Sequence, residues 1–509
     1  MYAKVTSLAL SGFDAIPVEV EADVSVGLPR FDLVGLPGSS VSESRERVRA
    51  AIRNCGLEFP ISRITVNLAP ADVRKEGPVF DLPILAALLS ATRQISVDFT
   101  DTILIGEISL SGEVRRVKGV LPMLIAAREQ GFRTAFIPAG NRAEATVVDG
   151  LTVFPAADLP QLVRHWDGTE PISPVPHLPF EQGLPPAEDA LDFADVRGQE
   201  LPKMALEIAA AGGHNLLMTG PPGSGKSMLA RRLPTILPAL SYGEALETTK
   251  LYSVAGRLPE ETALLRTRPF RAPHHSATLA AMTGGGNQIG PGEVSLSTNG
   301  VLFLDELPHF SKSVLESLRQ PLEDGQVTIS RARGSVTYPS RFMLVCAMNP
   351  CPCGHFGDPN HPCTCSASAR QTYRNRVSGP LLDRIDLLVK VSPLPEQELF
   401  AASRGEPSAA IRERVTAARA VQQARFADAG VACNAQMTAE QTAAFCRLTP
   451  EAEDLFRQAY RTLRFSARSR DRILRTARTI ADLDGAADIR PGDLAAALQF
   501  RFLEDPAGQ

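Results

Sequence analysis

The sequence predicts an α/β protein that ends in an all-helical domain. Short β-like runs alternate with helical runs in the first part of the chain, and a glycine-rich loop later joins an apolar run to a helix. Beyond residue 393 only helical periodicity remains. A length of 509 residues fits about three domains, and a hydrophobic content of 44% is enough for packed cores. We expect domains at 1–166, 191–392 and 393–509, with 167–190 as a linker.

The composition favours a soluble, cytoplasmic protein with no membrane partner. No apolar run reaches the ~18 residues of a membrane span, and the N-terminus lacks the basic and apolar regions of a secretion signal. The cysteines, four of them between Cys351 and Cys365, do not fit a secreted disulfide framework. A net charge of -4 gives no general attraction to nucleic acid, so a DNA-binding site would need local basic clusters.

The N-terminal domain has the pattern of a mixed α/β fold. Helical spacing covers 41–55 and 122–130. The β-like runs lie at 18–21, 31–34, 64–68, 102–105 and 134–138.

Two segments of this domain, 74–83 and 105–114, resemble the proteolytic domain of Lon-type proteases, which implies a ribosomal S5 domain 2-like fold. That family carries its nucleophilic serine where this chain has Val79, and our alignment places its catalytic lysine at Leu121. A serine–lysine dyad needs a hydroxyl to attack and an amine to accept the proton, and neither side chain supplies one. We therefore expect an inactive protease fold that serves as a scaffold or as a nucleic-acid-binding module.

The linker is rich in proline and poor in apolar periodicity. Its composition fits a stiff, extended connection or, equally well, an ordered strap along the next domain. The prolines are Pro171, Pro174, Pro176, Pro179, Pro185 and Pro186.

The glycine-rich loop has the P-loop pattern G-x4-G-K-S between a strand-like run and a helix. Its glycines allow backbone N–H groups to point at phosphate oxygens, next to the positive end of the helix dipole. We expect Lys226 to reach the β and γ phosphates of ATP and Ser227 to hold Mg2+. The expected ATP-binding residues are Gly220, Pro221, Pro222, Gly223, Ser224, Gly225, Lys226 and Ser227.

Two later apolar runs end in polar residues. The run 301–304 is followed by Asp305 and Glu306, which predicts a magnesium ligand and a general base for water at the carboxyl end of a buried strand. The run 342–348 ends in Asn349, which resembles sensor 1 of AAA+ ATPases, the residue that positions the attacking water. The segment 195–200 is similar to AAA+ segments that flank the adenine.

Two arginines fit further AAA+ roles. Arg384, in a short turn, is expected to reach the γ-phosphate of a neighbouring subunit, which would require a ring; the alternative is an ion pair with Asp383 or Asp386. Arg468 aligns with sensor 2 of the AAA+ lid, which contacts nucleotide phosphates. For Arg470, Arg472, Arg475 and Arg478, we favour a solvated or interface face of the same helix.

The motif order, the segment 271–279, the glycines at 284–286 and the segment 349–354 resemble the magnesium-chelatase-like AAA+ proteins of the ComM or YifB family. The resemblance covers essentially the whole chain. It implies a homo-hexameric ATPase that acts as a branch-migration helicase on single-stranded and branched DNA, without sequence specificity, during natural transformation.

Two insertions support DNA binding. One is the glycine-rich segment 273–297, and the other is a hairpin over 326–338. In related helicases such insertions enter the central channel, so Arg331 and Arg333 would hold the phosphate backbone; the alternative is a solvent-exposed hairpin tip. His274 and His275 could contact DNA or a neighbouring subunit, or simply pack together.

The cysteine cluster consists of two C-x-C pairs in a loop rich in proline and glycine. Four thiolates can form a structural Zn2+ site, although the spacing differs from the usual C-x2-C. His355 or His361 could replace one cysteine, and a reduced cysteine loop is the alternative. The expected ligands are Cys351, Cys353, Cys363 and Cys365.

Two other functions remain open. A magnesium-chelatase motor subunit would share the ATPase core, but we expect such a subunit to lack a Lon-like N-terminal domain. A non-proteolytic AAA+ regulator that remodels proteins would use that domain as an adaptor.

Overall fold

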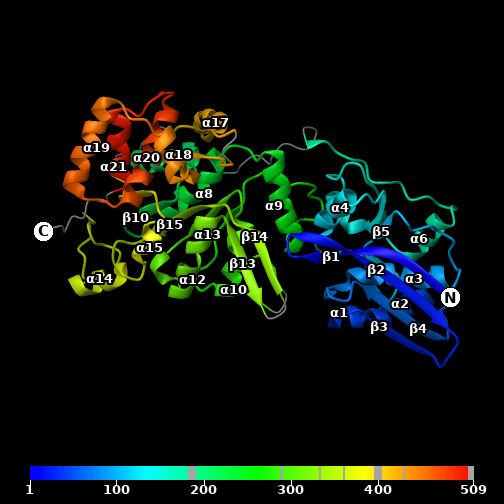
Figure 1. Cartoon of the computed structure of the whole chain (residues 1–509). Coiled ribbons are helices and arrows are strands. Elements are labelled where there is room, and N and C mark those ends of the chain that lie inside the picture. Colours follow the sequence, from blue (N-terminus) through cyan, green and yellow to red (C-terminus); the bar gives the residue numbers. More distant parts are fainter. Residues whose placement is uncertain are drawn as a thin grey trace.

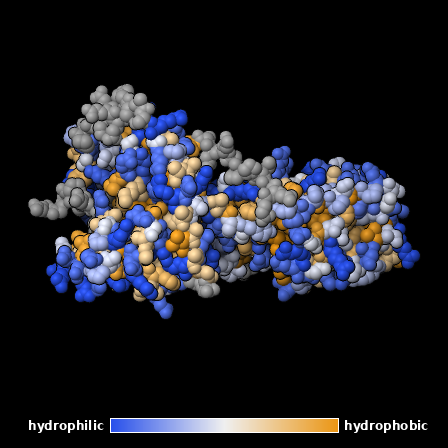
Figure 2. Space-filling model, turned by 90° about the horizontal axis from the view of Figure 1, so that it is seen from above, coloured by the Kyte–Doolittle hydropathy of each residue, from blue (hydrophilic) through white to orange (hydrophobic). Residues whose placement is uncertain are grey.

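The computed structural model describes residues 1–180, 191–286, 290–331, 334–358, 361–394, 404–427 and 430–501. An N-terminal α/β domain lies at one end of an elongated molecule, and a P-loop domain with the C-terminal helices lies at the other (Figure 1). Seen from above, hydrophilic and hydrophobic residues are mixed over both parts (Figure 2). None of the helices in the described segments is long and apolar enough to span a membrane.

The N-terminal domain is built on a seven-stranded sheet in the order β3-β4-β2-β1-β5-β8-β9. The expected strands are present, but β1 and β9 were not predicted, and β1 pairs with β2 along its full length. Strands β1, β2 and β4 pair antiparallel and the remaining pairs are parallel. The strands are β1 Tyr2–Ser11, β2 Asp14–Ser25, β3 Arg30–Val34, β4 Arg63–Ala69, β5 Thr102–Leu104, β8 Thr134–Pro138 and β9 Thr152–Ala156, with a small ladder of β6 Glu107–Ile108 and β7 Val114–Arg115.

Helix α3 fills the core of this domain. It is apolar on all sides, as expected for a fully enclosed helix, and all but one of its residues are buried. Val79 and Leu121, at the positions of the Lon-type dyad, are buried in the same core. The helices are α1 Ser39–Ser42, α2 Ser44–Asn54, α3 Asp81–Ala91, α4 Val120–Glu129, α5 Arg142–Ala145 and α6 Leu159–Trp166.

The P-loop domain contains a five-stranded parallel sheet in the order β11-β12-β15-β10-β16. Every residue of β12 and β15 is buried, which explains their unbroken apolar sequences. The strands are β10 Leu216–Thr219, β11 Phe270–Arg271, β12 Val301–Leu304, β15 Met343–Met348 and β16 Leu387–Lys390. The helices of this domain are α7 Glu200–Gly212, α8 Lys226–Ile236, α9 Tyr242–Val254, α10 Leu279–Thr283, α11 Glu293–Leu296, α12 Lys312–Ser317, α13 Arg319–Asp324, α14 Ala367–Arg374 and α15 Gly379–Leu382.

The expected hairpin is present as a separate two-stranded sheet of β13 Gln326–Arg331 and β14 Gly334–Pro339. It extends away from the parallel sheet (Figure 1). Threonine and serine side chains pair across its exposed face, between Thr328 and Thr337 and between Ser330 and Ser335.

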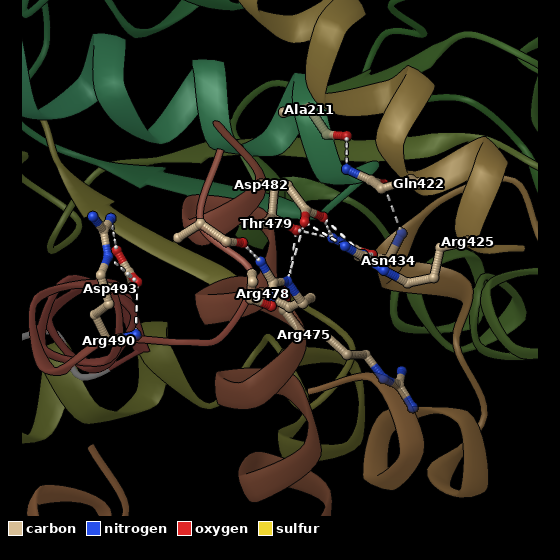
Figure 3. A network of polar contacts seen from close by, with 12 residues as sticks. Ala211, Gln422, Arg425, Asn434, Arg475, Arg478, Thr479, Asp482, Arg490 and Asp493 are labelled. Carbon is tan, nitrogen blue, oxygen red and sulfur yellow. Dashed lines mark hydrogen bonds and ion pairs between the residues drawn. The ribbon is translucent and has the colours of Figure 1, made fainter. Parts of the chain in front are cut away.

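The C-terminal part is helical, with α17 Ser408–Arg425, α18 Ala439–Phe445, α19 Pro450–Leu463, α20 Ala467–Leu483 and α21 Pro491–Arg501. A buried polar network joins α17, α20 and the segment at Asn434 (Figure 3). Asp482 accepts from Arg478 (3.1 Å), Arg425 and Asn434, and Gln422 donates to the carbonyl of Ala211 in α7.

The expectation that the arginines of α20 form a solvated or interface face is wrong for Arg478. Its side chain is 1% exposed, and it donates to the Asp482 carboxylate and to the carbonyls of Ala486 and Ala487. Arg472 is also largely buried and lies 3.5 Å from Asp386, whereas Arg470 is exposed as expected. Periodicity shows which residues share a face but not which helix covers it.

The N-terminal domain packs against α9 of the P-loop domain. The N–H of Gly119, at the start of α4, donates to the carbonyl of Ser253, and the Ser253 hydroxyl bonds to Glu144. Lys250 lies 4.2 Å from the centre of the Phe13 ring. Gly12, in the turn between β1 and β2, contacts Val336 of the β13–β14 hairpin so closely that no Cβ would fit there.

The first part of the expected linker runs along the N-terminal domain. The N–H groups of Val175 and Leu178 donate to the carbonyls of Val153 and Thr146. Residues 181–190, with Pro185 and Pro186, lie outside the described residues.

Candidate functional site

The P-loop lies between β10 and α8. Gly223 and Gly225 have φ angles of 76° and 94°, which other residues rarely adopt, so these two glycines allow the loop to turn before the helix. Helix α8 begins at Lys226, and its first N–H groups, which have no partner inside the helix, point toward the loop at its N-terminus. This arrangement suits a phosphate group.

Lys226 is held inside the loop. Its Nζ donates to the carbonyls of Gly220 (2.7 Å) and Pro221 (2.8 Å) and lies 3.3 Å from Oδ1 of Asn349. Burial lowers the pKa of Lys226, and the nearby Asp305 carboxylate partly opposes this effect. The ammonium group bonds to carbonyls of the loop that is expected to hold the phosphates.

Ser227 and Asp305 meet across the end of the sheet. The Ser227 hydroxyl donates to Oδ2 of Asp305 at 2.5 Å, and the N–H of Glu306 donates to Oδ1 of the same carboxylate. Strand β15, which ends just before Asn349, lies between β10 and β12. A hydroxyl and a carboxylate at this distance fit two neighbouring oxygen ligands of Mg2+.

Glu306 has a neighbour that the sequence analysis missed. Nδ1 of His275 lies 3.3 Å from Oε2 of Glu306, whose backbone is left-handed with a φ angle of 53°. The rings of His274 and His275 are packed, with centroids 4.0 Å apart, and His309 lies 5.8 Å beyond. β11 pairs with β12, so the segment after β11 passes the end of the acidic strand. The only signal in the sequence was the histidine pair itself, shortly after the two-residue strand β11.

Arg384 forms an ion pair within its own chain. The guanidinium is 7% exposed and donates to Glu323 of α13 and to the carbonyl of Pro380. The partner is thus neither Asp383 nor Asp386. In this conformation Arg384 is tied to the helix that leads into the β13–β14 hairpin.

Asp386 connects the sheet to α20. Its Oδ2 accepts from the N–H of Asn215 at 3.0 Å and lies 3.5 Å from Nδ1 of His214, while Arg472 approaches Oδ1 at 3.5 Å. Burial opposes ionisation of this carboxyl, but the nearby His214 imidazole and the charge of Arg472 lower its pKa overall. Asn215 directly precedes β10, the strand that leads into the P-loop. A movement of α20 would therefore be transmitted through Arg472 and Asp386 to this strand.

A cavity of about 760 Å³ separates the P-loop from the helical part. Thr219, Gly220 and Pro221 line one side, and Phe465 and Ser469 of the α20 region line another. Arg468 is the second residue of α20, lies between these two lining residues in sequence, and is exposed. The cavity is large enough for a small organic ligand.

The hairpin that carries the predicted DNA-binding arginines packs on the glycine-rich segment. A Cβ on Gly284 would lie 2.7 Å from Cδ1 of Ile329 in β13. Arg331 is the last residue of β13 and pairs with Gly334. The Arg331 side chain and the whole of Arg333 lie outside the described residues.

The four clustered cysteines converge. The sulfur of Cys351 lies 3.4 Å from that of Cys353 and 3.7 Å from that of Cys363, and the Cys353 and Cys363 sulfurs are 3.6 Å apart. A tetrahedral zinc with Zn–S bonds of about 2.3 Å has sulfurs about 3.8 Å apart. Cys365 belongs to the same group, in which all ligand atoms lie within 4.8 Å.

The environment favours a thiolate at Cys353, whereas burial raises the pKa of the Cys351 thiol. Backbone N–H groups of His355 and Thr364 lower the pKa of the Cys353 thiol to about 5. His355 and His361 instead form a separate group with Asp358, in which each Nδ1 lies within 3.2 Å of the same carboxylate oxygen.

The cysteine loop also touches the P-loop. A Cβ on Gly354, whose φ angle is 87°, would lie 2.6 Å from Cδ of Pro222. Asn349 leads directly into this loop. The cysteine cluster therefore lies next to the end of β15, where Asn349 contacts Lys226.

Comparisons with known proteins agree with this architecture. Family models described as "Magnesium chelatase, subunit ChlI", "Subunit ChlI of Mg-chelatase" and "Magnesium chelatase, subunit ChlI C-terminal" match residues 192–399, 20–141 and 405–501. The Competence protein ComM of Haemophilus influenzae is 42% identical over 98% of this chain and 97% of its own length. The uncharacterized protein YifB of Escherichia coli is 42% identical, with the same coverage.

The chain belongs to the magnesium-chelatase-like family of ComM and YifB proteins.

Membership of the ComM/YifB family corrects one step of the sequence analysis. We expected chelatase motor subunits to lack the N-terminal domain, but the model that matches residues 20–141 is itself described as a chelatase subunit. The N-terminal domain therefore does not argue against a chelatase-like function.

Partial matches extend to two other classes. A Lon protease of Mycolicibacterium smegmatis is 31% identical over 31% of this ComM/YifB chain and 22% of its own length. The DNA repair protein RadA of Brucella abortus is 33% identical over 26% of the chain and 28% of its own length. Both similarities cover a minor part of each protein.

Proposed function

We propose that this protein is an ATP-driven DNA motor, a helicase that moves branched DNA and acts as a homo-hexameric ring in the cytoplasm. The observation that carries the proposal is the convergence of Lys226, Ser227, Asp305, Glu306 and Asn349 at the carboxyl end of one parallel sheet. A pair of oxygen ligands for Mg2+ and a second carboxylate, that of Glu306, beside a phosphate-binding loop suit hydrolysis of a nucleoside triphosphate.

Each residue of this group has a defined task. Lys226 exchanges its bonds to the loop carbonyls for the β and γ phosphates, while Glu306 accepts a proton from the attacking water. Asn349, next to the lysine, orients that water. When bound, Mg2+ would neutralise charge on the phosphates, and Ser227 and Asp305 are the residues that would hold it.

A ring would give Arg384 its role. In the single chain the guanidinium is paired with Glu323, so it must leave this partner to reach the γ-phosphate of a neighbour. Such an arginine can contribute ~10^3 to 10^5 in rate. Arg468, at the start of α20, would contact the phosphates from the helical part, which would thereby serve as the lid.

The trans arrangement can be tested by mixing. Lys226→Ala removes the phosphate contact, and Arg384→Ala removes the finger. If the finger acts on a neighbour, a mixture of the two inactive variants recovers ATPase activity at interfaces that combine an intact loop with an intact arginine. A mixture that stays inactive, although the two variants co-assemble, would contradict the proposal.

DNA is proposed as the substrate because of the hairpin and the relatives. The hairpin extends from the P-loop domain, and its first strand ends at Arg331. Helix α13, which leads into that strand, carries Glu323, the partner of Arg384. Arg331 and Arg333 would hold phosphates without reading sequence. A role in natural transformation follows from the relative named a competence protein.

We also propose that Cys351, Cys353, Cys363 and Cys365 hold a structural Zn2+. The sulfur–sulfur distances of 3.4–3.7 Å between Cys351, Cys353 and Cys363 lie close to the tetrahedral value. Zinc at this site would fix the loop that packs on Pro222 and would thereby stabilise the P-loop conformation.

A synthetic three- or four-way DNA junction tests the motor function. The wild-type chain should exchange strands of the junction with ATP, and Lys226→Ala should not. ATPase activity should rise with single-stranded or branched DNA. The loss of DNA binding in an Arg331→Ala, Arg333→Ala variant that retains ATPase activity would count against a protein-remodelling regulator.

The second candidate is a chelatase-like motor that drives metal insertion into a tetrapyrrole, favoured by the three chelatase-subunit models that match the chain. This function predicts ATPase stimulation by a porphyrin and a second subunit, with no response to DNA. Measuring both responses on one preparation separates the two candidates.

A further inference from the structure

Helix α2 of the N-terminal domain carries a stripe of three exposed arginines. Arg45, Arg49 and Arg53 are spaced four residues apart, so they lie along one face of the helix. Arg47, in the same stretch, turns inward and pairs with the buried Asp81. Within the described part of the chain, none of the three stripe arginines forms an ion pair with a carboxylate.

An aromatic pair lies directly beside the stripe. The guanidinium groups of Arg49 and Arg53 lie 5.8 and 5.7 Å from the centre of the Phe59 ring, and the Phe31 ring lies 6.1 Å from that of Phe59. Ile61, on the same segment, is 79% exposed. Together with Arg30, these side chains line a groove of about 390 Å³.

The charges of the groove are predominantly positive. Arg30, Arg45, Arg49 and Arg53 face two carboxylates, Asp32 and Glu46. Asp32 is already engaged by Arg30 at 2.8 Å. Like charges at this spacing destabilise a helix, so the stripe has a cost that a bound polyanion would relieve.

We infer that this groove binds single-stranded nucleic acid. The arginines would contact successive phosphates along α2, because neighbours in the stripe are about 6 Å apart along the axis. Phe59, Phe31 and the guanidinium planes would stack against bases, which requires no base sequence. A polar polyanion fits four guanidinium groups better than a protein surface that matches only the exposed Ile61.

The groove is separate from the hairpin. α2, β3 and β4 lie on the part of the N-terminal domain away from α9, whereas the hairpin belongs to the P-loop domain (Figure 1). The inference extends the proposed DNA function by assigning the N-terminal domain a strand-holding role. Binding there needs no ATP.

Titration of a fluorescent oligothymidylate with the full-length protein tests the inference. The stripe variant carries Arg45→Ala, Arg49→Ala and Arg53→Ala. A charge-matched control carries Arg115→Ala, Arg133→Ala and Arg164→Ala, which are exposed positions elsewhere on the same domain. Arg49→Gln with Arg53→Gln serves as a milder variant, and circular dichroism with thermal unfolding verifies the fold of each.

The expected result is at least a tenfold loss of affinity in the stripe variant and no change in the control. The slope of log affinity against log salt should fall by about 2, since each phosphate contact on a single strand contributes about 0.7. Equal affinities for stripe variant and control would overturn the inference. So would unchanged DNA binding combined with loss of the oligomer, because the groove would then be an interface between copies.

The same titration separates this inference from the proposed motor. A wild-type chain that binds the oligonucleotide through the stripe but does not move junctions would contradict the motor and leave the groove assigned. If the wild-type chain moves junctions and the stripe variant binds the oligonucleotide as tightly as wild type, the motor is supported and the groove inference is contradicted.

Discussion

The hydroxyl of Ser227 lies 2.5 Å from Oδ2 of Asp305, although the two residues follow strands that are not neighbours in the sheet. The strand between them ends just before Asn349, whose Oδ1 lies 3.3 Å from Nζ of Lys226. The three strand ends thus form one polar surface next to the P-loop. Glu306, the residue after Asp305, is positioned to act on a molecule bound there.

Glu306→Gln should abolish hydrolysis while preserving nucleotide binding. The amide keeps the shape of the side chain but cannot accept the proton of the attacking water, so we expect kcat to fall by ~10^2 to 10^4. Binding of a fluorescent ATP analogue should remain within a few-fold of wild type. Lys226→Ala is the matched control and should lose binding; hydrolysis at wild-type rate in Glu306→Gln would exclude this carboxylate as the base.

His275→Ala should slow hydrolysis with little effect on ATP affinity. The imidazole lies 3.3 Å from the Glu306 carboxylate, and without it the base loses a neighbour that fixes its direction. We expect kcat to fall on the order of tenfold, because small misplacements of reacting groups are costly. His274→Ala, which removes the exposed partner ring, is the control. Steady-state kinetics that show kcat within twofold of wild type would refute a positioning role.

Removing the metal from the cysteine cluster should weaken both the fold and the ATPase activity. The wild-type protein should contain about one zinc per chain by elemental analysis, and Cys353→Ser should contain much less. The thermal midpoint should fall by several degrees, since the loop has little apolar core of its own. Cys55→Ser, in the N-terminal domain, is the control. A wild-type chain without zinc would rule out the proposed site.

Arg478→Met should destabilise the helical part by about 3 kcal/mol. The substitution leaves the buried Asp482 without one of its cationic partners and leaves two carbonyls without a donor. Arg470→Met, at an exposed position, should change stability by less than about 0.5 kcal/mol. Urea unfolding followed by far-UV circular dichroism measures both. Equal midpoints for the two variants would show that the network in Figure 3 contributes little.

Glu323→Gln should raise the ATPase activity of the assembled protein. Arg384 is held by Glu323 in the single chain, and a neutral partner holds a guanidinium less strongly. If the arginine serves a neighbouring subunit, ATPase activity of the assembled protein should rise by about twofold or more, and Arg384→Ala should lose it. Activity that falls in both variants would indicate that the ion pair is needed for the fold instead.

Much of the nucleotide site could be predicted from the sequence, because each strand end carries its own local pattern. Three local patterns can be recognised in the sequence alone: a P-loop between a strand and a helix, two acids after an apolar run, and an amide after the next apolar run. His275 could not be found this way, since its contact with Glu306 depends on the pairing of β11 with β12. The partner of Arg384 was missed because Glu323 lies on a helix distant in sequence.

The sequence by itself determined the α/β class, the P-loop and its acidic partner, the hairpin and the convergence of cysteines in one loop. These features depend on short-range patterns of apolar residues, glycines and polar strand ends. Only the tertiary structure decided which polar groups meet: Arg478 turned out to be buried, Arg384 to be held within its own chain, and the α2 arginines to stand beside an aromatic pair. The physical reason is that periodicity specifies a face, whereas the packing of distant elements decides what covers it.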